Sequence, residues 1–501
     1  MGLNTVLVPA YWDLTEPTEG HFDFTLTDKV LQQARRNNLK VVFLWFGAWK
    51  NSMSCYAPLW FKENHKKYPR AYTQTGKPLE IASAFSENVF QADNRAFSAW
   101  LQHIAAIDKE EGTVIMVQIE NEIGMLEDAR DYSQEADKAF HAPVPTELIN
   151  YLQKNKKTLH SQMIKKWESQ GCKKQGAWQE VFGADIYTDE IFMAWHYARY
   201  VERMAQTARS IYNVPLYVNA AMNSRGRKPG EYPSAGPLAH LIDVWRCGAP
   251  NIDILAPDLY DDGFTNWVAQ YKLHNNPLFI PEIRLTDNNG VRAFYIFGEH
   301  DAIGISPFSI EDGSDSSDSP LVQSYTRLKE LMPLLTEYQG KGMMKGLLFN
   351  QKDKERIIMD DDLSITCRHY FTLPWDPRAT DGSAWPEGGG LILKLSKNEY
   401  IVAGSGIVLE FTKASEKPGS EIRKQLGEDG FALSNEQIKT KKERFQGMRC
   451  GIGHVDEVEV DKEGKFRYIR RLNGDQDHQG RHVRISVGEF KILHVRLYEY
   501  Q

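Results

Sequence analysis

Two apolar strand patterns that each end in a glutamate constrain this sequence more than any other feature. The first, residues 114–124 (VIMVQIENEIG), runs from five mostly apolar residues directly into Glu120 and Glu122. The second, residues 278–284 (LFIPEIR), delivers Glu282 in the same way. Carboxylates are costly to place at the end of a buried strand. The two patterns together therefore predict a pair of carboxylates that face one cleft.

Such a pair is the minimum that hydrolysis of a glycosidic bond requires. A retaining glycosidase uses one protonated carboxyl as acid and one ionised carboxyl as nucleophile, about 5–5.5 Å apart. The structural alternative is that Glu120 and Glu122 cap a helix while Glu282 pairs with Arg284. Because the pattern of a strand ending in glutamate occurs twice within one region of alternating strands and helices, the catalytic interpretation is favoured over the structural one. Strand alternation places Glu120 and Glu122 on the same side, so spacing does not choose between them.

The first two-thirds of the chain alternates strand patterns with helical patterns. Strand patterns begin near Thr5, Lys40, Val114, Pro215, Ile252, Leu278 and Ala302. Helical patterns cover residues 26–37, 97–107, 147–168, 190–212 and 321–338. Strands separated by helices predict a parallel sheet, and at this length a (β/α)8 barrel is expected. A closed barrel needs eight strands, one more than the pattern supplies.

Beyond residue 340 the pattern changes to short alternating β segments separated by glycine and charged turns. Such segments lie at residues 390–395, 400–411, 465–472 and 483–498. They predict an all-β, sandwich-like module. We therefore predict a (β/α) barrel catalytic domain at residues 1–338 and a C-terminal accessory β domain at residues 339–501. Trp385, in a turn-rich loop, either reaches a ligand or covers the sheet, and packing is the favoured interpretation.

Composition excludes several classes of function. The net charge of −7 without a basic cluster argues against nucleic acid as a partner. The five cysteines are scattered without CxxC spacing, so neither a disulfide framework nor a zinc site is expected. No apolar run is long enough to span a bilayer, and residues 1–10 lack the pattern of a signal peptide.

The motif QIENEIG at residues 118–124 resembles the acid/base motif of glycoside hydrolase family 35, the β-galactosidases of the large retaining (β/α)8 clan. The resemblance implies that the acid is the glutamate directly after asparagine, Glu122, following the fourth strand. It implies that the nucleophile is Glu282 in PEIR, following the seventh. Residues 12–24 (WDLTEPTEGHFDF) are similar to the family pattern W-x-x-x-E-P-x-x-G-x-F-x-F. The resemblance spans roughly residues 1–312, and the C-terminal part looks like the accessory β domain of a bacterial subgroup.

The resemblance implies a retaining exo-β-galactosidase that acts on terminal β-galactosyl residues of oligo- or polysaccharides by double displacement and needs no metal or other cofactor. It also implies a secreted or periplasmic location. The alternatives are another retaining β-glycosidase of the clan and a non-catalytic glycan-binding protein descended from such an enzyme. An oligomer is compatible with the sequence.

After the third strand the family pattern reads P-G-P-Y-x-N-A-E, whereas residues 46–53 here read FGAWKNSM. Trp49 and Asn51 are expected to replace the sugar-contacting tyrosine and asparagine. Met53 stands where the family has glutamate, and loss of that acceptor predicts side activity on a related pentoside or fucoside. The other residues expected to contact the sugar are Asn121, Tyr11, Asn219, Tyr260 and Phe308.

If the strand near Thr5 corresponds to the second strand of the family barrel, the first strand and its helix are missing from this sequence. The neighbouring strands would then have unpaired edges. We expect direct pairing of the second and eighth strands, another segment or a partner chain to close the gap. Alternatively, the sequence begins at an internal methionine of a longer protein.

Overall fold

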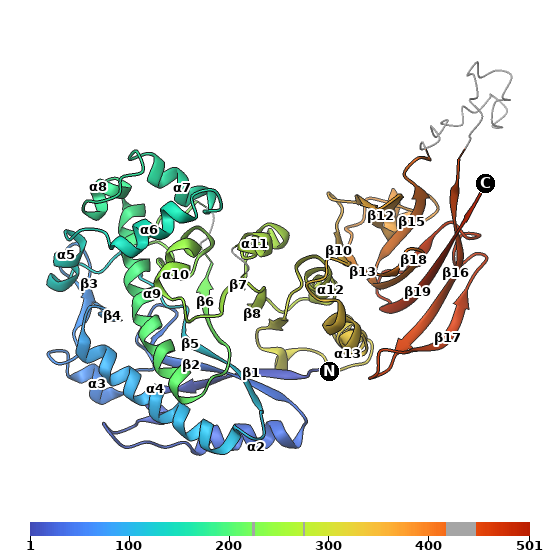
Figure 1. The fold of residues 1–501 in the computed structure, drawn as a ribbon. Coiled ribbons are helices and arrows are strands. Elements are labelled where there is room, and N and C mark those ends of the chain that lie inside the picture. The colour runs from blue at the N-terminus through green and yellow to red at the C-terminus, as the bar shows by residue number, and fades with distance from the viewer. Residues whose placement is uncertain (223–225, 274–275, 417–446) are drawn as a thin grey trace. The chain divides into compact units, whose positions relative to one another are not determined.

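The computed structural model describes residues 1–222, 226–273, 276–416 and 447–501, and it divides into two compact units (Figure 1). The α/β unit comprises Leu3–Thr286 and Ala302–Gly313 and contains the parallel sheet. The β unit comprises Met1–Gly2, Asp287–Asp301 and Ser314–Gln501 and contains two antiparallel sheets.

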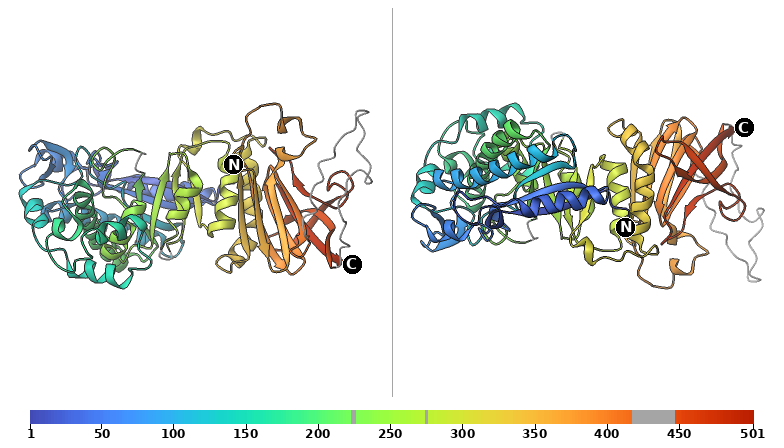
Figure 2. Two further views of the ribbon diagram at one scale, coloured as in Figure 1. Left: turned by 90° about the horizontal axis from the view of Figure 1, so that it is seen from above. Right: turned by 90° about the horizontal axis from the view of Figure 1, so that it is seen from below.

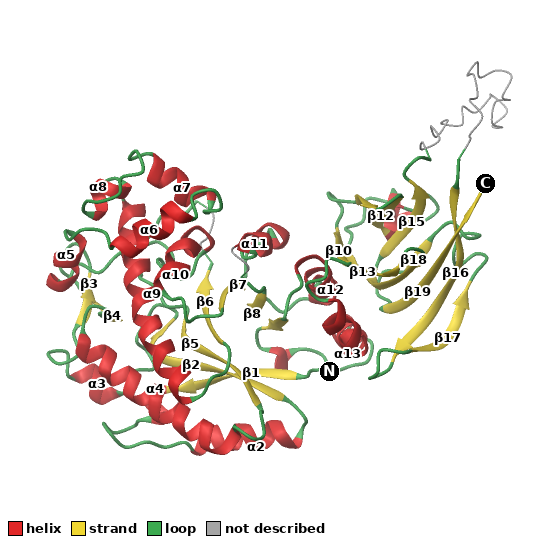
Figure 3. Cartoon of the chain, in the orientation of Figure 1, coloured by secondary structure: helices red, strands yellow, loops and turns green. Residues whose placement is uncertain are grey.

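The sheet of the α/β unit has seven parallel strands in the order β1-β2-β5-β6-β7-β8-β9 (Figure 3). They are β1 (Thr5–Tyr11), β2 (Lys40–Lys50), β5 (Val114–Asn121), β6 (Leu216–Ala221), β7 (Ile254–Leu259), β8 (Phe279–Ile283) and β9 (Gly304–Pro307). Each strand lies where an apolar pattern predicted one. Among the described residues no pairing joins β9 to β1. The described residues of the unit therefore form an open, curled parallel sheet and not the closed eight-stranded barrel that the sequence predicted.

Some helices of the α/β unit pack against strands of this sheet, and others pack against neighbouring helices. These helices are α1 (Trp12–Thr15), α2 (Thr25–Arg36), α3 (Leu59–Glu63), α4 (Glu87–Asp108), α5 (Gln134–Phe140), α6 (Thr146–Lys154), α7 (Ser161–Glu168), α8 (Trp178–Phe182), α9 (Ile186–Ile211), α10 (Ile242–Gly248) and α11 (Phe264–Gln270). A separate hairpin pairs β3 (Arg70–Tyr72) with β4 (Pro78–Ala82). The predicted helical stretch at 147–168 is two helices, because the chain leaves α6 at Asn155 and re-enters a helix after His160, which caps α7.

Apolar residues of β2 alternate between two cores. Phe43 and Trp45 pack against Trp100 of α4, with ring centroids 5.3 and 5.4 Å apart. Leu44 and Phe46 point the other way and join a smaller cluster inside the curl of the sheet. A strand buried on both faces needs this continuous apolar sequence, which explains why KVVFLWF shows no polar alternation.

The WDLTEPTEGHFDF motif stabilises the loop after β1. Glu16 is fully buried, and its carboxylate accepts hydrogen bonds from Trp12 Nε1 at 3.0 Å, Gly20 N at 2.7 Å and Arg95 Nη2 at 2.7 Å. The donors come from both sides of the loop and from α4. The motif therefore has a structural explanation in these contacts.

The β unit is a two-sheet sandwich, as predicted. One sheet has the order β10-β13-β14-β19-β16-β17 and the other β11-β12-β15-β18, with one apolar core between them. The strands are β10 (Met344–Phe349), β11 (Glu355–Asp360), β12 (Leu363–His369), β13 (Gly388–Ser396), β14 (Glu399–Ser405), β15 (Ile407–Lys413), β16 (Arg449–Val460), β17 (Phe466–Leu472), β18 (Val483–Ile485) and β19 (Lys491–Tyr500). The predicted segment 400–411 is two strands, one in each sheet, because Gly406 (φ +71) lets the chain turn between them.

Helices α12 (Asn289–His300) and α13 (Pro320–Tyr338) belong to the β unit rather than to the α/β unit. Helix α12 lies against β10 and β13 (Figure 2). At Gly298 the approach is so close that a Cβ atom would lie 2.7 Å from the carbonyl oxygen of Lys345. The predicted domain boundary at residue 338 therefore differs from the observed division. Apolar periodicity shows that a helix covers a sheet, but it does not show which sheet.

Trp385 covers one end of the sandwich. Its ring stacks on His369, with centroids 4.9 Å apart, and its Nε1 donates to the carbonyl of Arg378 at 2.9 Å. These contacts agree with the packing interpretation. Among the described residues, no helix is both long enough and apolar enough to cross a membrane.

Candidate active site

The two predicted glutamates meet at the carboxyl ends of the parallel strands. Glu122 directly follows β5, and Glu282 is the penultimate residue of β8. A third carboxyl, that of Asp258 near the end of β7, joins them, and one oxygen from each of the three lies within 4.8 Å of the others. In a barrel-type sheet the carboxyl ends of all the parallel strands lie at one edge, so residues that end different strands come together there.

Glu120 and Glu122 lie on different sides of β5, so the prediction from strand alternation is wrong. Both residues adopt left-handed backbone conformations, with φ of +57° and +46°, which end the regular pleat. Glu120 accepts a hydrogen bond from Trp49 N at 2.7 Å and faces Asp93 of α4. Glu122 instead donates its backbone N–H to Asn219 Oδ1 at 2.9 Å. The structure thus selects Glu122 for the carboxyl cluster.

Both oxygens of Glu282 are held by donors. The Tyr260 hydroxyl donates to Oε2 at 2.7 Å, and Asn121 Nδ2 donates to Oε1 at 3.4 Å. Glu282 is 9% exposed and Glu122 is 6% exposed. The two donors fix the orientation of a carboxylate in a site that is largely closed to water.

Burial and neighbouring charge favour the protonated forms of Glu122 and Asp258. Burial raises the pKa of Glu122, the charge of Glu282 raises it further, and Lys50 and a hydrogen bond with Asp258 oppose the shift. Burial, followed by the charges of Glu282 and Glu122, raises the pKa of Asp258 well above its ordinary range. Like charges in a desolvated cluster retain protons to higher pH. Glu122 is therefore suited to act as an acid near neutral pH.

Two of the predicted sugar-contacting residues form an aromatic wall beside Glu282. Tyr260 is 37% exposed and Phe308 is 54% exposed, and their rings meet edge to face with centroids 6.3 Å apart. Exposed ring faces of this kind suit the apolar face of a pyranose. Asn219 lies deeper, where it bridges the Glu122 backbone and the Asp258 carboxyl, to which its Nδ2 donates at 2.6 Å.

The other predicted residues lie in packed or turn positions. Tyr11 packs against Phe46 and Tyr56. Trp49 is fully buried and meets Tyr200 edge to face at 4.8 Å.

Asn51 is exposed at a tight turn in which Lys50 N donates to the Met53 carbonyl at 2.8 Å. Asn51 and Ser52 both have positive φ, +51° and +60°, which is the geometry that asparagine favours in such turns. Met53 is half-buried against the main core. Trp49 and Asn51 thus make structural contacts at these positions, and their contact with a sugar stays a prediction.

Asp258 was not among the residues predicted from the sequence, although a signal was present. Residues 254–258 repeat the pattern of an apolar strand that ends in a carboxylate. Tyr217 of β6 was also missed. Its hydroxyl is buried with no hydrogen-bond partner among the described residues, and the same is true of Asn121 Oδ1. Unpaired buried atoms of this kind beside the carboxyl cluster are available to hydrogen-bond a polar ligand.

The described residues contain two groups of side chains close enough to hold a metal ion. One is the cluster of Glu122, Asp258 and Glu282. The other lies in the β unit and comprises His454, Asp456 and His494. In the second group, Arg471 donates to both oxygens of Asp456, at 2.8 and 3.1 Å, so a cation already occupies that carboxylate.

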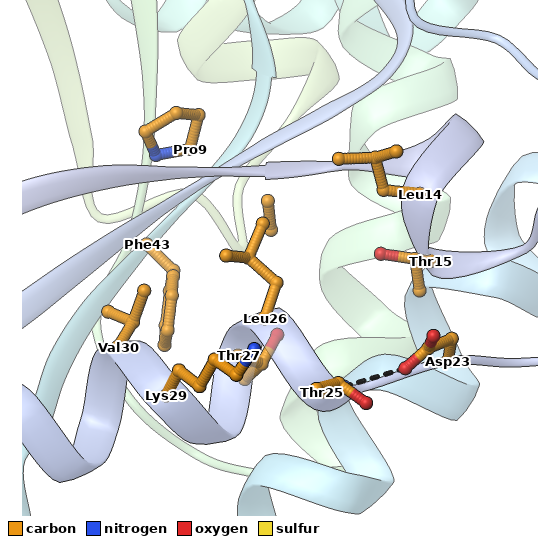
Figure 4. A pocket seen from close by; sticks show the side chains of 11 residues that line it. Pro9, Leu14, Thr15, Asp23, Thr25, Leu26, Thr27, Lys29, Val30 and Phe43 are labelled. Carbon is orange, nitrogen blue, oxygen red and sulfur yellow. Dashed lines mark hydrogen bonds between the residues drawn. The ribbon is translucent and has the colours of Figure 1, made fainter.

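A cavity of about 290 Å³ is lined by residues of β1 and α2 (Figure 4). It is lined mainly by apolar groups such as Pro9, Leu26 and Phe43, together with Asp23 and Thr25. None of the predicted site residues lines it. The carboxyl ends of β5, β7 and β8 therefore remain the candidate active site.

Behind that site, Asp93 and Glu120 form a second, fully buried carboxyl pair. Asp93 accepts hydrogen bonds from Trp45 Nε1 at 2.9 Å and from the Tyr200 hydroxyl at 2.8 Å. Burial, followed by the charge of Asp93, raises the pKa of Glu120 well above its ordinary value of 4.5. The pair is stable only if the two carboxyls share a proton.

Replacing Glu120 by glutamine should therefore flatten the pH dependence of stability. The folded wild type retains a proton that the unfolded chain releases above pH 4.5, so its unfolding free energy falls as pH rises. The amide is neutral at every pH and can donate to Asp93. Relative to wild type, the unfolding free energy of Glu120→Gln should rise by about 1–2 kcal/mol between pH 5 and 8. Urea unfolding of both proteins at several pH values measures this difference. If the unfolding free energies of wild type and Glu120→Gln changed with pH in parallel, the prediction would be refuted.

Comparison with known families supports the predicted class and corrects the predicted family. Residues 1–217 match the model of glycoside hydrolase family 42, described as beta-galactosidase, and residues 321–484 match a domain of unknown function (DUF5597). The first match confirms the resemblance to β-galactosidases of the retaining clan, but it does not support family 35. It includes Glu122 and ends before Glu282. No curated protein matches the chain.

The solved structures to which this chain is similar include β-galactosidases. One from the psychrophilic Marinomonas ef1 is 13% identical, with 67% of this chain and 56% of that chain covered and a TM-score of 0.44. A GH42 β-galactosidase from G. stearothermophilus is 14% identical, with 68% of this chain and 53% of that chain covered and a TM-score of 0.44. The chain thus spans about half the length of these structures.

Proposed function

We propose that this chain is a retaining, exo-acting β-galactosidase that removes terminal β-galactosyl residues from oligo- or polysaccharides. The observation that carries the proposal is the pair Glu122 and Glu282, with carboxylate oxygens within 4.8 Å, at the strand ends of a chain whose first 217 residues match a β-galactosidase family model. Retaining glycosidases hold their carboxyls about 5–5.5 Å apart, whereas inverting enzymes need about 6.5–9.5 Å to admit a water. The short separation favours retention.

The surroundings of the two glutamates suggest their roles. Glu282, oriented by Tyr260 and Asn121, attacks the anomeric carbon, and the bond to the leaving oxygen breaks as Glu122 donates its proton to that oxygen. Glu122, now a carboxylate, then removes a proton from water. That water attacks the anomeric carbon and releases Glu282.

The burial of the two glutamates favours a chain end as substrate. Both glutamates are at most 9% exposed, so a terminal sugar can enter more readily than the middle of a polymer. Tyr260 and Phe308 offer ring faces for stacking. The unpartnered Tyr217 hydroxyl and Asn121 Oδ1 would bind sugar hydroxyls.

A panel of nitrophenyl glycosides tests this proposal. Hydrolysis should be fastest on the β-galactoside, with side activity on the β-fucoside and α-L-arabinopyranoside that share most of its hydroxyls. Proton NMR of the first-formed sugar should show β-galactose. Preference for a β-glucoside would indicate another glycosidase of the clan. Tight glycan binding without turnover would indicate a binding protein.

Replacing Tyr260 by phenylalanine should lower kcat by about 10- to 100-fold, because Glu282 loses a hydrogen bond to its charged group. KM should change little, since the ring that stacks on the sugar remains. Steady-state kinetics on the nitrophenyl β-galactoside measures both constants.

The contrasting variant is Phe308→Ala, which removes a ring without a hydroxyl. It should raise KM and affect kcat less. If Tyr260→Phe raised only KM, the tyrosine would be a binding residue and would not orient the nucleophile.

A further inference from the structure

Asp258 belongs to the carboxyl cluster, but the mechanism proposed above gives it no role. It is fully buried on β7 and lies opposite Glu282 in the strand register. Its Oδ2 accepts a hydrogen bond from Asn219 Nδ2 at 2.6 Å. Its Oδ1 has no donor among the described residues. Two nearby glutamates, Glu122 and Glu282, have oxygens within 4.8 Å of it.

An ionised Asp258 would be costly in this position. It would place a carboxylate with one unpaired oxygen beside two other acidic groups, out of contact with water. A proton on Oδ1 removes the charge and turns the unpaired oxygen into a donor. Glu122 is the acceptor within reach, and the burial and charge effects on the pKa of Asp258 act in the same direction.

We propose that Asp258 is a positioning residue that stays protonated throughout the reaction and donates a hydrogen bond to Glu122. The inference rests on the proposed function. Negative charge develops on Glu122 as its proton passes to the leaving oxygen, and a fixed donor in a buried site stabilises that charge. The same bond then holds Glu122 as a carboxylate while it activates water. Asp258 keeps its proton, and the proton that moves is that of Glu122.

Other titratable groups face the cluster from neighbouring elements. Lys50 at the end of β2 and Glu282 on β8 act on Glu122, and Tyr217, Tyr260 and Tyr271 surround Asp258 and Glu282. Burial raises the pKa of all three tyrosines, so they remain neutral over the working range. The alkaline limb of kcat/KM then reports the ionisation of Glu122 in the free enzyme.

Two substitutions separate a protonated from an ionised Asp258. Asp258→Asn replaces one neutral donor with another. The alkaline limb of kcat/KM should therefore stay within about 0.3 pH unit of its wild-type position, while kcat falls a few-fold. Asp258→Leu removes the donor, so the alkaline limb of kcat/KM should shift to higher pH by about 1–2 units. Hydrolysis of the glycosyl-enzyme should also slow. If Asp258 were ionised, Asp258→Asn would remove a negative neighbour and the limb would move down by about a unit or more. That result would overturn the proposal.

An infrared measurement tests the proton without relying on activity. At neutral pH the wild type should show a protonated carboxyl C=O band that Asp258→Asn loses and that Asp261→Asn, in the loop after β7, retains. Glu122 and the Asp93–Glu120 pair also hold protons and give bands of their own, so the readout is the difference between the spectra of wild type and Asp258→Asn. If that difference contains no carboxyl C=O band, the inference is refuted even in an active enzyme. A wild type that shows this band but hydrolyses no glycoside leaves the protonated Asp258 intact and refutes the proposed function instead.

Discussion

Replacing Glu282 by alanine should lower kcat on an aryl β-galactoside on the order of 10⁴- to 10⁶-fold, the largest loss expected for any single change in this chain. The variant lacks the group that forms the covalent intermediate, and no leaving group compensates for a missing covalent partner. The nitrophenyl and dinitrophenyl galactosides should therefore lose rate to a similar extent. Steady-state rates on the two substrates measure the effect.

Chemical rescue distinguishes loss of the nucleophile from loss of the fold. Azide should enter the space left by Glu282 and attack from that face, giving the α-galactosyl azide, which the anomeric coupling constant identifies. Glu282→Gln keeps the side-chain volume and should be equally inactive but should resist rescue. Formation of the β-azide by Glu282→Ala would show that the roles of the two glutamates are reversed.

Apolar periodicity made the parallel sheet predictable. The continuous apolar stretches that include 40–46 and 114–118 are strands buried on both faces, and each of the seven predicted strands is present. The carboxyl ends of parallel strands meet at one edge, so Glu122 and Glu282 could be placed together before their distance was known. These inferences depend on local pattern and on one general property of parallel sheets.

The rest of the site depends on backbone conformation and on contacts between distant segments. Glu120 was expected beside Glu122, but positive φ at both residues breaks the alternation and turns Glu120 toward Asp93. Asp258 showed the right local pattern, yet only the strand register brings it opposite Glu282. Asn51, placed by motif comparison, lies in a turn whose geometry it favours. A motif match shows that two sequences have the same residue types at corresponding positions. It does not show that those residues have the same neighbours in the folded protein.

Replacing Glu122 by alanine should have an effect that depends on the leaving group. As the acid, Glu122 protonates the leaving oxygen, so on a substrate with a poor leaving group kcat/KM should fall by about 10²- to 10⁴-fold. On dinitrophenyl galactoside, whose phenol is acidic, kcat/KM should fall far less. The measurement is kcat/KM across a series of aryl galactosides of increasing phenol pKa, which should give a steeper dependence than in wild type.

The same variant should also stall after forming the glycosyl-enzyme, because Glu122 serves as base for the incoming water. With dinitrophenyl galactoside we expect a burst of phenol followed by slow turnover. Azide needs no base, so it should raise kcat and give the β-galactosyl azide. Glu120→Gln is the matched control, since Glu120 faces Asp93 and should leave the leaving-group dependence of wild type intact. If a Glu120 variant stalled in this way while Glu122→Ala turned over normally, Glu120 would be the acid.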